Sequence, residues 1–373
     1  MNEQKTAQNE SDGFCIMVDG TGTIGLPTVR CLKKFQSHFG LREVICRKYS
    51  PNEEHLGMLW RLHLDGIKLA VEKSKYEKFA ALLKEAPDVF CPEYTYEEAL
   101  EKVVMVIDCT KDGEGLKNKE KVYSKYPHLV AMGQGSETHF GFPYAYGHND
   151  DVLDTYTGRY VWIMSCNVHA ILAVLHTLTH GYQEIENIVS IRFHLERRGA
   201  DVVNKKTIVT PEVGVSTHPY FGTHQAEDAM ELLKTLGIQT LDMHAVADKD
   251  PQPFMHKTEA RIILKKPIDK RELIRLFQEN IFTGITYHRD IGGIYVEGDD
   301  WGLKGRINLQ CVLVVPSVEQ PRPYELVFTF VTPQDGNPIF SSCAALGRYL
   351  QPERWRDIMR DHFHPYLRRF QIV

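Results

Sequence analysis

The sequence contains no run of about 18 apolar residues, the length that a membrane-spanning helix needs, so no membrane partner is expected. Residues 1–12 are polar and lack the apolar stretch of a secretory signal peptide, and we expect them to form a disordered tail. The 8 cysteines are scattered, without the paired spacing of a disulfide scaffold. These absences predict a cytoplasmic protein with reduced thiols.

An excess of positive charge is also missing. Lys and Arg total 44 against 49 Asp and Glu, for a formal net charge of −5. Because non-specific nucleic-acid binding depends on a basic surface, no nucleic-acid partner is predicted. The 17 histidines show no metal-ligand spacing such as H-E-x-x-H, so no metal site is predicted either.

What is present is an ordinary globular composition, with 43% hydrophobic and 25% charged residues. At about 150 residues per domain, 373 residues predict two domains. Residues 13–165 alternate short apolar runs with helix-like stretches, which is typical of α/β domains with a parallel sheet. The strands expected there cover residues 14–18, 44–46, 103–108, 129–132 and 160–164, with a helix over 26–35.

The pattern changes after Cys166, where three- and four-residue apolar spacing predicts a helix that begins at the cysteine. Longer β-rich stretches follow at 188–195, 258–264, 310–315 and 324–331, with one helix expected over 269–277. We expect an α+β domain over 166–335 with a largely antiparallel sheet, and a helical segment over 336–373.

A glycine-rich turn joins the first strand to the first helix. The residues match G-x-G-x-x-G and read Gly20, Thr21, Gly22, Thr23, Ile24, Gly25. In this motif the first glycine allows a tight turn, the second lets a pyrophosphate approach the backbone, and the third permits close packing. The motif predicts dinucleotide binding, and the alternative is a βα turn that binds nothing.

Two cations stand where the second strand of such a unit ends. A carboxylate is usual there for the ribose 2′-hydroxyl of NAD, but this chain has Arg47 and Lys48. Cations suit a 2′-phosphate, so NADP is favoured over NAD, unless the two charges are simply solvated. Thr110 and Gly113 follow the next strand and are expected to border the same cofactor crevice.

Cys166 joins a predicted strand to a predicted helix. A thiol at a helix N-terminus is stabilised as the thiolate, which is the nucleophilic form. A small buried hydrophobic residue is the alternative for any single cysteine.

Taken together, these motifs resemble the archaeal (type II) glyceraldehyde-3-phosphate dehydrogenases. The resemblance is carried, in family order, by Val18–Gly25, Val106–Thr110, Gly115–Lys119, Gly133–Gly135, Ser165–Asn167, Arg197–Asp201, Met255–His256 and Leu264–Pro267. It implies a Rossmann domain, a catalytic domain and a C-terminal helix that packs back on the first. It also implies a homo-oligomer, either a tetramer or a dimer.

In the chemistry that the resemblance implies, the Cys166 thiolate attacks an aldehyde and hydride passes to the nicotinamide cofactor. The resulting thioester is released by phosphate, with a histidine as base. Asn167 would position the acyl oxygen, Ser165 and Arg197 would bind substrate, and Arg198 would bind cofactor. A surface charge pair is the alternative for the two arginines.

The substrate side departs from the family pattern. The family base is the second histidine of a His-x-His pair, where this chain has Thr258, so the candidate base is His256, two residues earlier. The family's His-His-Gly segment has no clean match, which leaves His218 and His224 as candidates for substrate binding. His169, three residues after the cysteine, is expected on a helix surface.

Three functions therefore stay open. The first is an NAD(P)-dependent aldehyde dehydrogenase of the glyceraldehyde-3-phosphate dehydrogenase type. The second is an NADPH-dependent reductase of semialdehydes or acyl phosphates. The third is a catalytically retired nucleotide-binding protein on the same fold.

Overall fold

The first half of the chain builds a parallel sheet in the computed structural model, which describes residues 13–199, 208–333 and 336–373. The expected tail over residues 1–12 lies outside the described residues, as do Ala200 and Asp201 of the family motif. Eight strands of the described residues pair in the order β4-β3-β2-β1-β5-β6-β8-β7, and every pairing is parallel. Their bounds are β1 (Phe14–Asp19), β2 (Leu41–Lys48), β3 (Lys68–Val71), β4 (Tyr94–Thr95), β5 (Met105–Asp108), β6 (Val130–Gln134), β7 (Phe142–Tyr144) and β8 (Tyr160–Ile163).

Helices connect these strands and cover the sheet. They are α1 (Gly25–Lys34), α2 (Leu56–Leu64), α3 (Tyr76–Leu83), α4 (Tyr96–Lys102), α5 (Glu114–Lys121) and α6 (Asp150–Thr155). Because both sheet faces are covered, a central strand such as β1 is apolar up to its last residue, Asp19, and Ile16, Met17 and Val18 are fully buried. Successive strands are added on one side of β1 up to β4 and on its other side from β5 onward, so the direction of strand order reverses between β1 and β5. Folds of this kind bind ligands at the carboxyl ends of the two strands at such a reversal.

The second half builds a mixed sheet. Its path is β10-β9-β11-β15-β13-β12, with β14 on β15. The bounds are β9 (Ile188–Arg198), β10 (Met243–Asp250), β11 (His256–Leu264), β12 (Thr283–Thr286), β13 (Cys311–Val314), β14 (Glu319–Arg322) and β15 (Glu325–Thr332). The centre is antiparallel, whereas β10 and β12 pair in parallel at the two ends of the path. A parallel α/β sheet followed by this α+β part confirms the predicted fold class.

This part contains more helix than the sequence pattern predicted. Besides α7 (Cys166–Leu178) and α9 (Lys270–Glu279), it holds α8 (His224–Thr235) and α10 (Ile291–Trp301). We expected a single helix between the strands of this part, and its described residues hold three, α8, α9 and α10. A signal for α8 was present, because Ala226, Ala229, Met230 and Leu233 follow helical spacing and are all buried.

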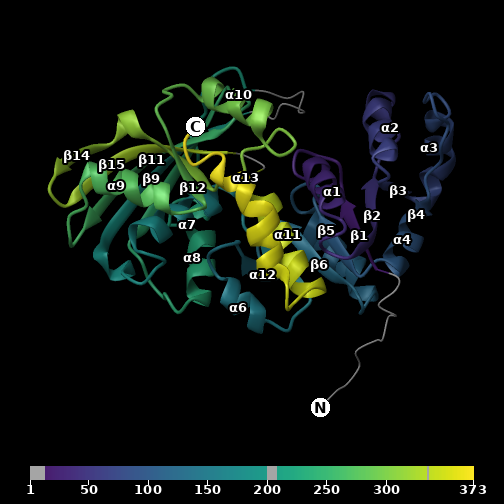
Figure 1. Ribbon diagram of the computed structural model, residues 1–373, viewed down its shortest axis with the longest axis horizontal. Coiled ribbons are helices and arrows are strands. Elements are labelled where there is room, and N and C mark those ends of the chain that lie inside the picture. The colour runs from purple at the N-terminus through teal and green to yellow at the C-terminus, as the bar shows by residue number, and fades with distance from the viewer. Residues whose placement is uncertain (1–12, 200–207, 334–335) are drawn as a thin grey trace, which may run out of the picture.

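The C-terminal segment runs between the two sheets, where Figure 1 shows α11 to α13 in yellow across the middle of the molecule. The helices are α11 (Asn337–Leu350), α12 (Trp355–Ile358) and α13 (His364–Arg368). Helix α11 packs against α1, with the Cys31 and Cys343 sulfurs 4.0 Å apart, and also against α7. The chain then returns to the second sheet, where the Val373 N–H donates to the Ile285 carbonyl at 2.9 Å. No helix in the described ranges is long and apolar enough to cross a membrane.

Candidate active site

The glycine loop after β1 has the geometry of a phosphate cradle. Gly20 has φ +109°, and a Cβ there would lie 2.8 Å from the Cys109 carbonyl oxygen. A Cβ on Gly25 would lie 2.2 Å from the Gly20 carbonyl oxygen, so packing within the protein requires both glycines. A Cβ on Gly22, in contrast, would meet nothing within 4 Å. The space at Gly22 is therefore open, as close approach of a pyrophosphate to the α1 N-terminus requires.

Arg47 faces the protein interior. Its Nη1 donates to both carboxylate oxygens of Asp19, at 3.0 and 2.8 Å, and its Nη2 donates to Glu72. Burial raises the pKa of Asp19 to about 6, although the Arg47 charge acts to lower it. The Tyr96 ring, 3.7 Å from the guanidinium carbon, covers the arginine. Arg47 therefore ties the end of β2 to the ends of β1 and β3.

Lys48, the next residue, reaches the glycine loop instead. Its Nζ donates to Thr21 Oγ1 at 3.0 Å, and burial lowers the pKa of this half-buried lysine. The β2 cation beside the cradle is thus Lys48.

Thr110 and Gly113 border the crevice but already have partners. The Thr110 N–H and hydroxyl both donate to Asp108 Oδ1, at 2.9 and 2.5 Å. The N–H groups of Gly113 and Leu116 donate to the carboxylate of Glu137, each at 2.7 Å. A protein carboxylate therefore occupies the N-terminus of α5.

A cavity of about 260 Å³ opens at the start of α7, the helix that begins with Cys166, and we call it the Cys166 hollow. It is lined by Ser136, Ser165, Asn167, Arg197, Arg198, His224, Gln225, Lys249 and His256. Cys166 is half-buried and is not itself among the lining residues, although its sequence neighbours Ser165 and Asn167 both are. The fold thus brings together most of the predicted substrate-side residues, from both halves of the chain.

The start of α7 holds the cysteine in place. The Ser165 hydroxyl caps the helix by accepting the Val168 N–H at 3.4 Å, and Cys166 is the first helical residue. Asn337 of α11 donates to the Cys166 carbonyl at 3.2 Å. Asn167 is only 5% exposed, yet its Oδ1 accepts no hydrogen bond from the residues that the structure describes. An unpartnered amide oxygen in a cavity wall is a suitable contact for a ligand.

Three adjacent strands place basic side chains in one row. Lys249 of β10 pairs with Arg197 of β9, and Lys257 of β11 pairs with Glu196, so His256 lies beside Arg197. Burial lowers the pKa of Arg197, while Lys249 Nζ contacts a Glu212 carboxylate oxygen at 3.1 Å. This side of the hollow suits an anionic ligand.

His256 is held in one orientation, because its Nδ1 accepts the backbone N–H of Arg198 at 3.0 Å. The ring is 6% exposed. Burial, with the nearby charges of Arg198 and Arg197, lowers the pKa of His256 to about 3. The imidazole is therefore neutral at physiological pH.

The two other candidate histidines, His224 and His218, lie in different places, and only His224 lines the hollow. His224 begins α8 and lines the hollow, and burial and the Arg197 charge lower its pKa. His218 is not among the lining residues. Its Nδ1 accepts the N–H groups of Tyr220 and Phe221 at 3.1 Å, which stabilises a turn.

His169 does not lie on a helix surface, and that expectation was wrong. Its side chain is fully buried, with Nδ1 2.9 Å from the Ser165 carbonyl and Nε2 2.7 Å from Ser341 Oγ. Because α7 is covered by sheet and helices on all sides, a polar residue on it needs an internal partner.

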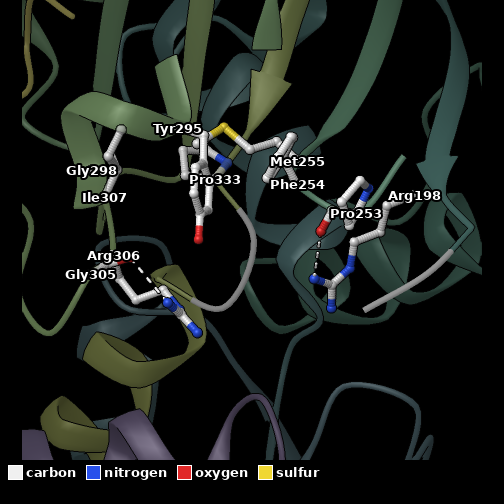
Figure 2. Close-up of a pocket in the computed structure, with 10 residues that line it drawn as sticks. All are labelled: Arg198, Pro253, Phe254, Met255, Tyr295, Gly298, Gly305, Arg306, Ile307 and Pro333. Carbon is white, nitrogen blue, oxygen red and sulfur yellow. Dashed lines mark hydrogen bonds between the residues drawn. The ribbon is translucent and has the colours of Figure 1, made fainter. Parts of the chain in front are cut away.

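A second, smaller pocket of about 20 Å³ adjoins Arg198. In Figure 2 the guanidinium groups of Arg198 and Arg306 lie on the same side of it, and Tyr295 stands between Arg306 and Phe254. Arg198 Nη1 donates to the Pro253 carbonyl at 3.3 Å, and the Phe254 and Tyr295 rings pack 4.5 Å apart. Arg198 therefore borders both this pocket and the Cys166 hollow.

Sequence reasoning missed three residues of the hollow. Ser136 directly follows the Gly133–Gly135 motif, a position that could have marked it. Lys249 and Gln225 carry no local signal, because only strand register and the position of α8 bring them to the cavity. In the described ranges, no cluster of three or more His, Cys, Asp or Glu side chains could hold a metal ion.

The fold and the hollow define a class: a two-part protein with a Rossmann-type sheet and a cysteine at the start of the helix between its halves. No protein-family model matches the chain. It is 28% identical over 174 residues to a glyceraldehyde-3-phosphate dehydrogenase of Methanobacterium bryantii, covering 47% of this chain and 48% of the relative. It is 32% identical over 184 residues to the Aeropyrum pernix enzyme of that name, covering 48% and 49%.

A longer match is 26% identical over 264 residues, to the glyceraldehyde-3-phosphate dehydrogenase of Metallosphaera sedula, with 69% of each chain covered. In the first relatives, the match spans about half of their length. The chain is thus a remote homologue of the archaeal glyceraldehyde-3-phosphate dehydrogenases.

Proposed function

We propose that this protein is an NAD(P)-dependent dehydrogenase of the glyceraldehyde-3-phosphate dehydrogenase type, acting on an aldehyde through Cys166. One observation carries the proposal: the Cys166 hollow gathers Asn167, the two arginines and two histidines from separate elements. The similarity to the archaeal enzymes supports the same reaction class. We also propose a cytoplasmic homo-oligomer, a tetramer or a dimer.

The cofactor in this proposal lies on the glycine loop Gly20–Gly25, with Thr110, Gly113 and Arg198 at the border of its site. When bound, the nicotinamide supplies the hydride acceptor. We propose NADP over NAD, because Lys48 brings a cation beside Thr21 of the cradle. Arg47 contributes by holding the β2 end in place through Asp19 and Glu72.

On the substrate side, Cys166 acts as the nucleophile and Asn167 positions the acyl oxygen. Arg197 and Lys249 attract an anionic group on the substrate, or a phosphate that releases the thioester. The start of α7 favours the thiolate that this chemistry needs.

Thr258 supports the two other candidate functions. It occupies the position of the family base, and its buried hydroxyl has no hydrogen-bond partner in the described part of the chain. Reduction of an acyl phosphate or a semialdehyde by NADPH does not need that base to activate a phosphate. A retired nucleotide-binding protein would keep the cradle and lose turnover.

The test follows nicotinamide absorbance with NAD and NADP against phosphorylated and plain aldehydes, with and without phosphate. We expect turnover that falls at least about 1,000-fold in Cys166→Ser, as for loss of a catalytic nucleophile. Cys91→Ser, at an exposed cysteine, is the matched control and keeps full activity. Full activity in Cys166→Ser would contradict the proposal. Binding of NADP without turnover of any substrate would favour the retired protein.

A further inference from the structure

The Cys166 hollow contains two histidines whose surroundings differ, His224 on α8 and His256 on β11. General acid–base chemistry needs a ring nitrogen with a free lone pair, whereas stabilising an oxyanion needs an N–H that stays protonated. The hydrogen bonds of the two rings show which ring can accept a proton and which can only donate an N–H.

In His256 the lone pair of Nδ1 is already used, because it accepts the Arg198 N–H at 3.0 Å. A neutral imidazole carries one proton, and with Nδ1 unprotonated that proton is on Nε2. Protonation of Nδ1 would turn two N–H groups toward each other and place a buried cation beside Arg197 and Arg198. His256 therefore presents a fixed N–H donor and no free lone pair.

In His224 both ring nitrogens are without a hydrogen bond to any described residue. The ring lies at the first position of α8, is half-buried and lines the same cavity as Asn167 and Ser165. The charged groups acting on it are Arg197, which lowers its pKa, and Asp112 and Glu227, which raise it. Its lone pair is thus available to a molecule in the hollow.

We propose that the two histidines have separate roles: His256 donates a hydrogen bond through Nε2–H to the carbonyl oxygen of the substrate, and His224 is the proton acceptor. This rests on the proposed function. When Cys166 Sγ attacks the carbonyl carbon, the carbon–sulfur bond forms and the carbonyl π electrons move to oxygen. The thiol proton passes to His224, directly or through a water, and His256 keeps its own proton.

The assignment explains why the chain tolerates Thr258 at the position of the family base. The histidine that β11 does supply, His256, lies beside the charges of Arg198 and Arg197, which oppose its protonation. His224 enters from α8, where burial and the Arg197 charge lower its pKa but the carboxylates of Asp112 and Glu227 act to raise it. Its ring nitrogens are not already engaged by a described residue, as His256 Nδ1 is.

Imidazole ¹⁵N NMR of the wild-type protein tests the assignment without any substrate. We expect His256 to stay neutral from about pH 8 to pH 5, with the proton on Nε2, while His224 titrates below its ordinary pKa of about 6.5. Spectra of His224→Gln and His256→Gln assign the two signals. Titration of His256 in this range, or a proton on its Nδ1, would overturn the proposal even if no aldehyde were turned over.

Kinetics then test the roles. A glutamine amide can donate but cannot accept the proton, so His256→Gln should keep its rate within about 10-fold, whereas His256→Ala should lose about 100- to 1,000-fold. His224→Gln should lose about 100-fold or more together with the acid limb of the pH–rate profile. Equal losses in the two His256 variants, with the acid limb kept in His224→Gln, would overturn the division of roles.

Discussion

Arg47 and Lys48 are neighbours in the sequence but have opposite environments. Successive residues of a strand point to opposite sides, so Arg47 enters the interior and meets Asp19 and Glu72, while Lys48 reaches Thr21. The sequence predicted two cations near the ribose. Asp19 at the end of β1 and Glu72 directly after β3 bind Arg47, and this leaves Lys48 as the cation beside the glycine loop.

Lys48→Gln should weaken NADPH binding about 10- to 150-fold, since one charge-assisted hydrogen bond is worth about 1.5–3 kcal/mol. NADH binding should change less than about 2-fold, because NADH has no 2′-phosphate. Titration of cofactor fluorescence measures both affinities. Lys84→Gln, at an exposed lysine, is the control and should alter neither.

Arg47→Gln should act on stability, because it leaves the buried Asp19 carboxylate without its cation. Removing one partner of a buried ion pair costs about 3–5 kcal/mol, so the thermal midpoint should fall. A selective loss of NADPH affinity with an unchanged midpoint would show instead that Arg47 reads the phosphate.

At the scale of elements, α8 shows how a helix positions a site at some cost to stability. Its first residues, His224 and Gln225, face the Cys166 hollow, and Asp228 one turn later is 2% exposed. Burial, together with the charges of the neighbouring Glu227 and Glu231, raises the pKa of Asp228 to about 7. At neutral pH, ionising the Asp228 carboxyl therefore costs more free energy in the folded protein than in the unfolded chain.

Asp228→Asn should stabilise the protein, and the gain should depend on pH. The folded pKa lies above the unfolded value of about 3.9, so the wild type loses stability as the pH rises through about 4 to 7. We expect a gain on the order of 2 kcal/mol near pH 8 and almost none near pH 3, below the unfolded pKa, measured by urea unfolding. Glu259→Gln, on an exposed position of β11, serves as the control. An equal gain at both pH values would exclude the ionisation of Asp228 as its cause.

At the scale of the whole molecule, α11 couples the two sheets. Ser342 accepts a hydrogen bond from Gln134 of β6 at 3.0 Å, and Ser341 contacts His169 of α7 at 2.7 Å. Asn337 binds the carbonyl of Cys166 itself. The C-terminal helix thus supports the position of the cysteine through its backbone carbonyl.

Ser341→Ala should destabilise the protein by about 1–3 kcal/mol, because it leaves both His169 Nε2 and the Tyr146 N–H, which donates to Ser341 Oγ at 3.0 Å, buried without a partner. Urea unfolding measures the loss. Ser124→Ala removes a hydroxyl that is exposed and bonded only to the Glu120 carbonyl, and it should cost less than about 1 kcal/mol. Equal losses in both variants would show that the contact between α11 and α7 contributes little.

Local patterns predicted much of the architecture. Strand β1, the glycine loop and α1 follow from apolar runs and glycine spacing within 25 residues, and the start of α7 at Cys166 was predicted in the same way. These features depend on backbone geometry and periodicity, which act between residues close in the chain. Helix α8 had such a signal and was still missed, because polar residues at its start obscured it.

The hydrogen-bond and charge partners of the polar side chains, in contrast, are not predicted by local patterns. Lys249 meets Arg197 through the register of β10 and β9, and His256 receives its N–H from Arg198 on a neighbouring strand. His169 is buried because α11 covers α7 from more than 150 residues away along the chain. The chain order alone establishes which residue types are near the cysteine. Burial and long-range register, which arise only when the elements pack, establish which of them are charged, which donate and which face the hollow.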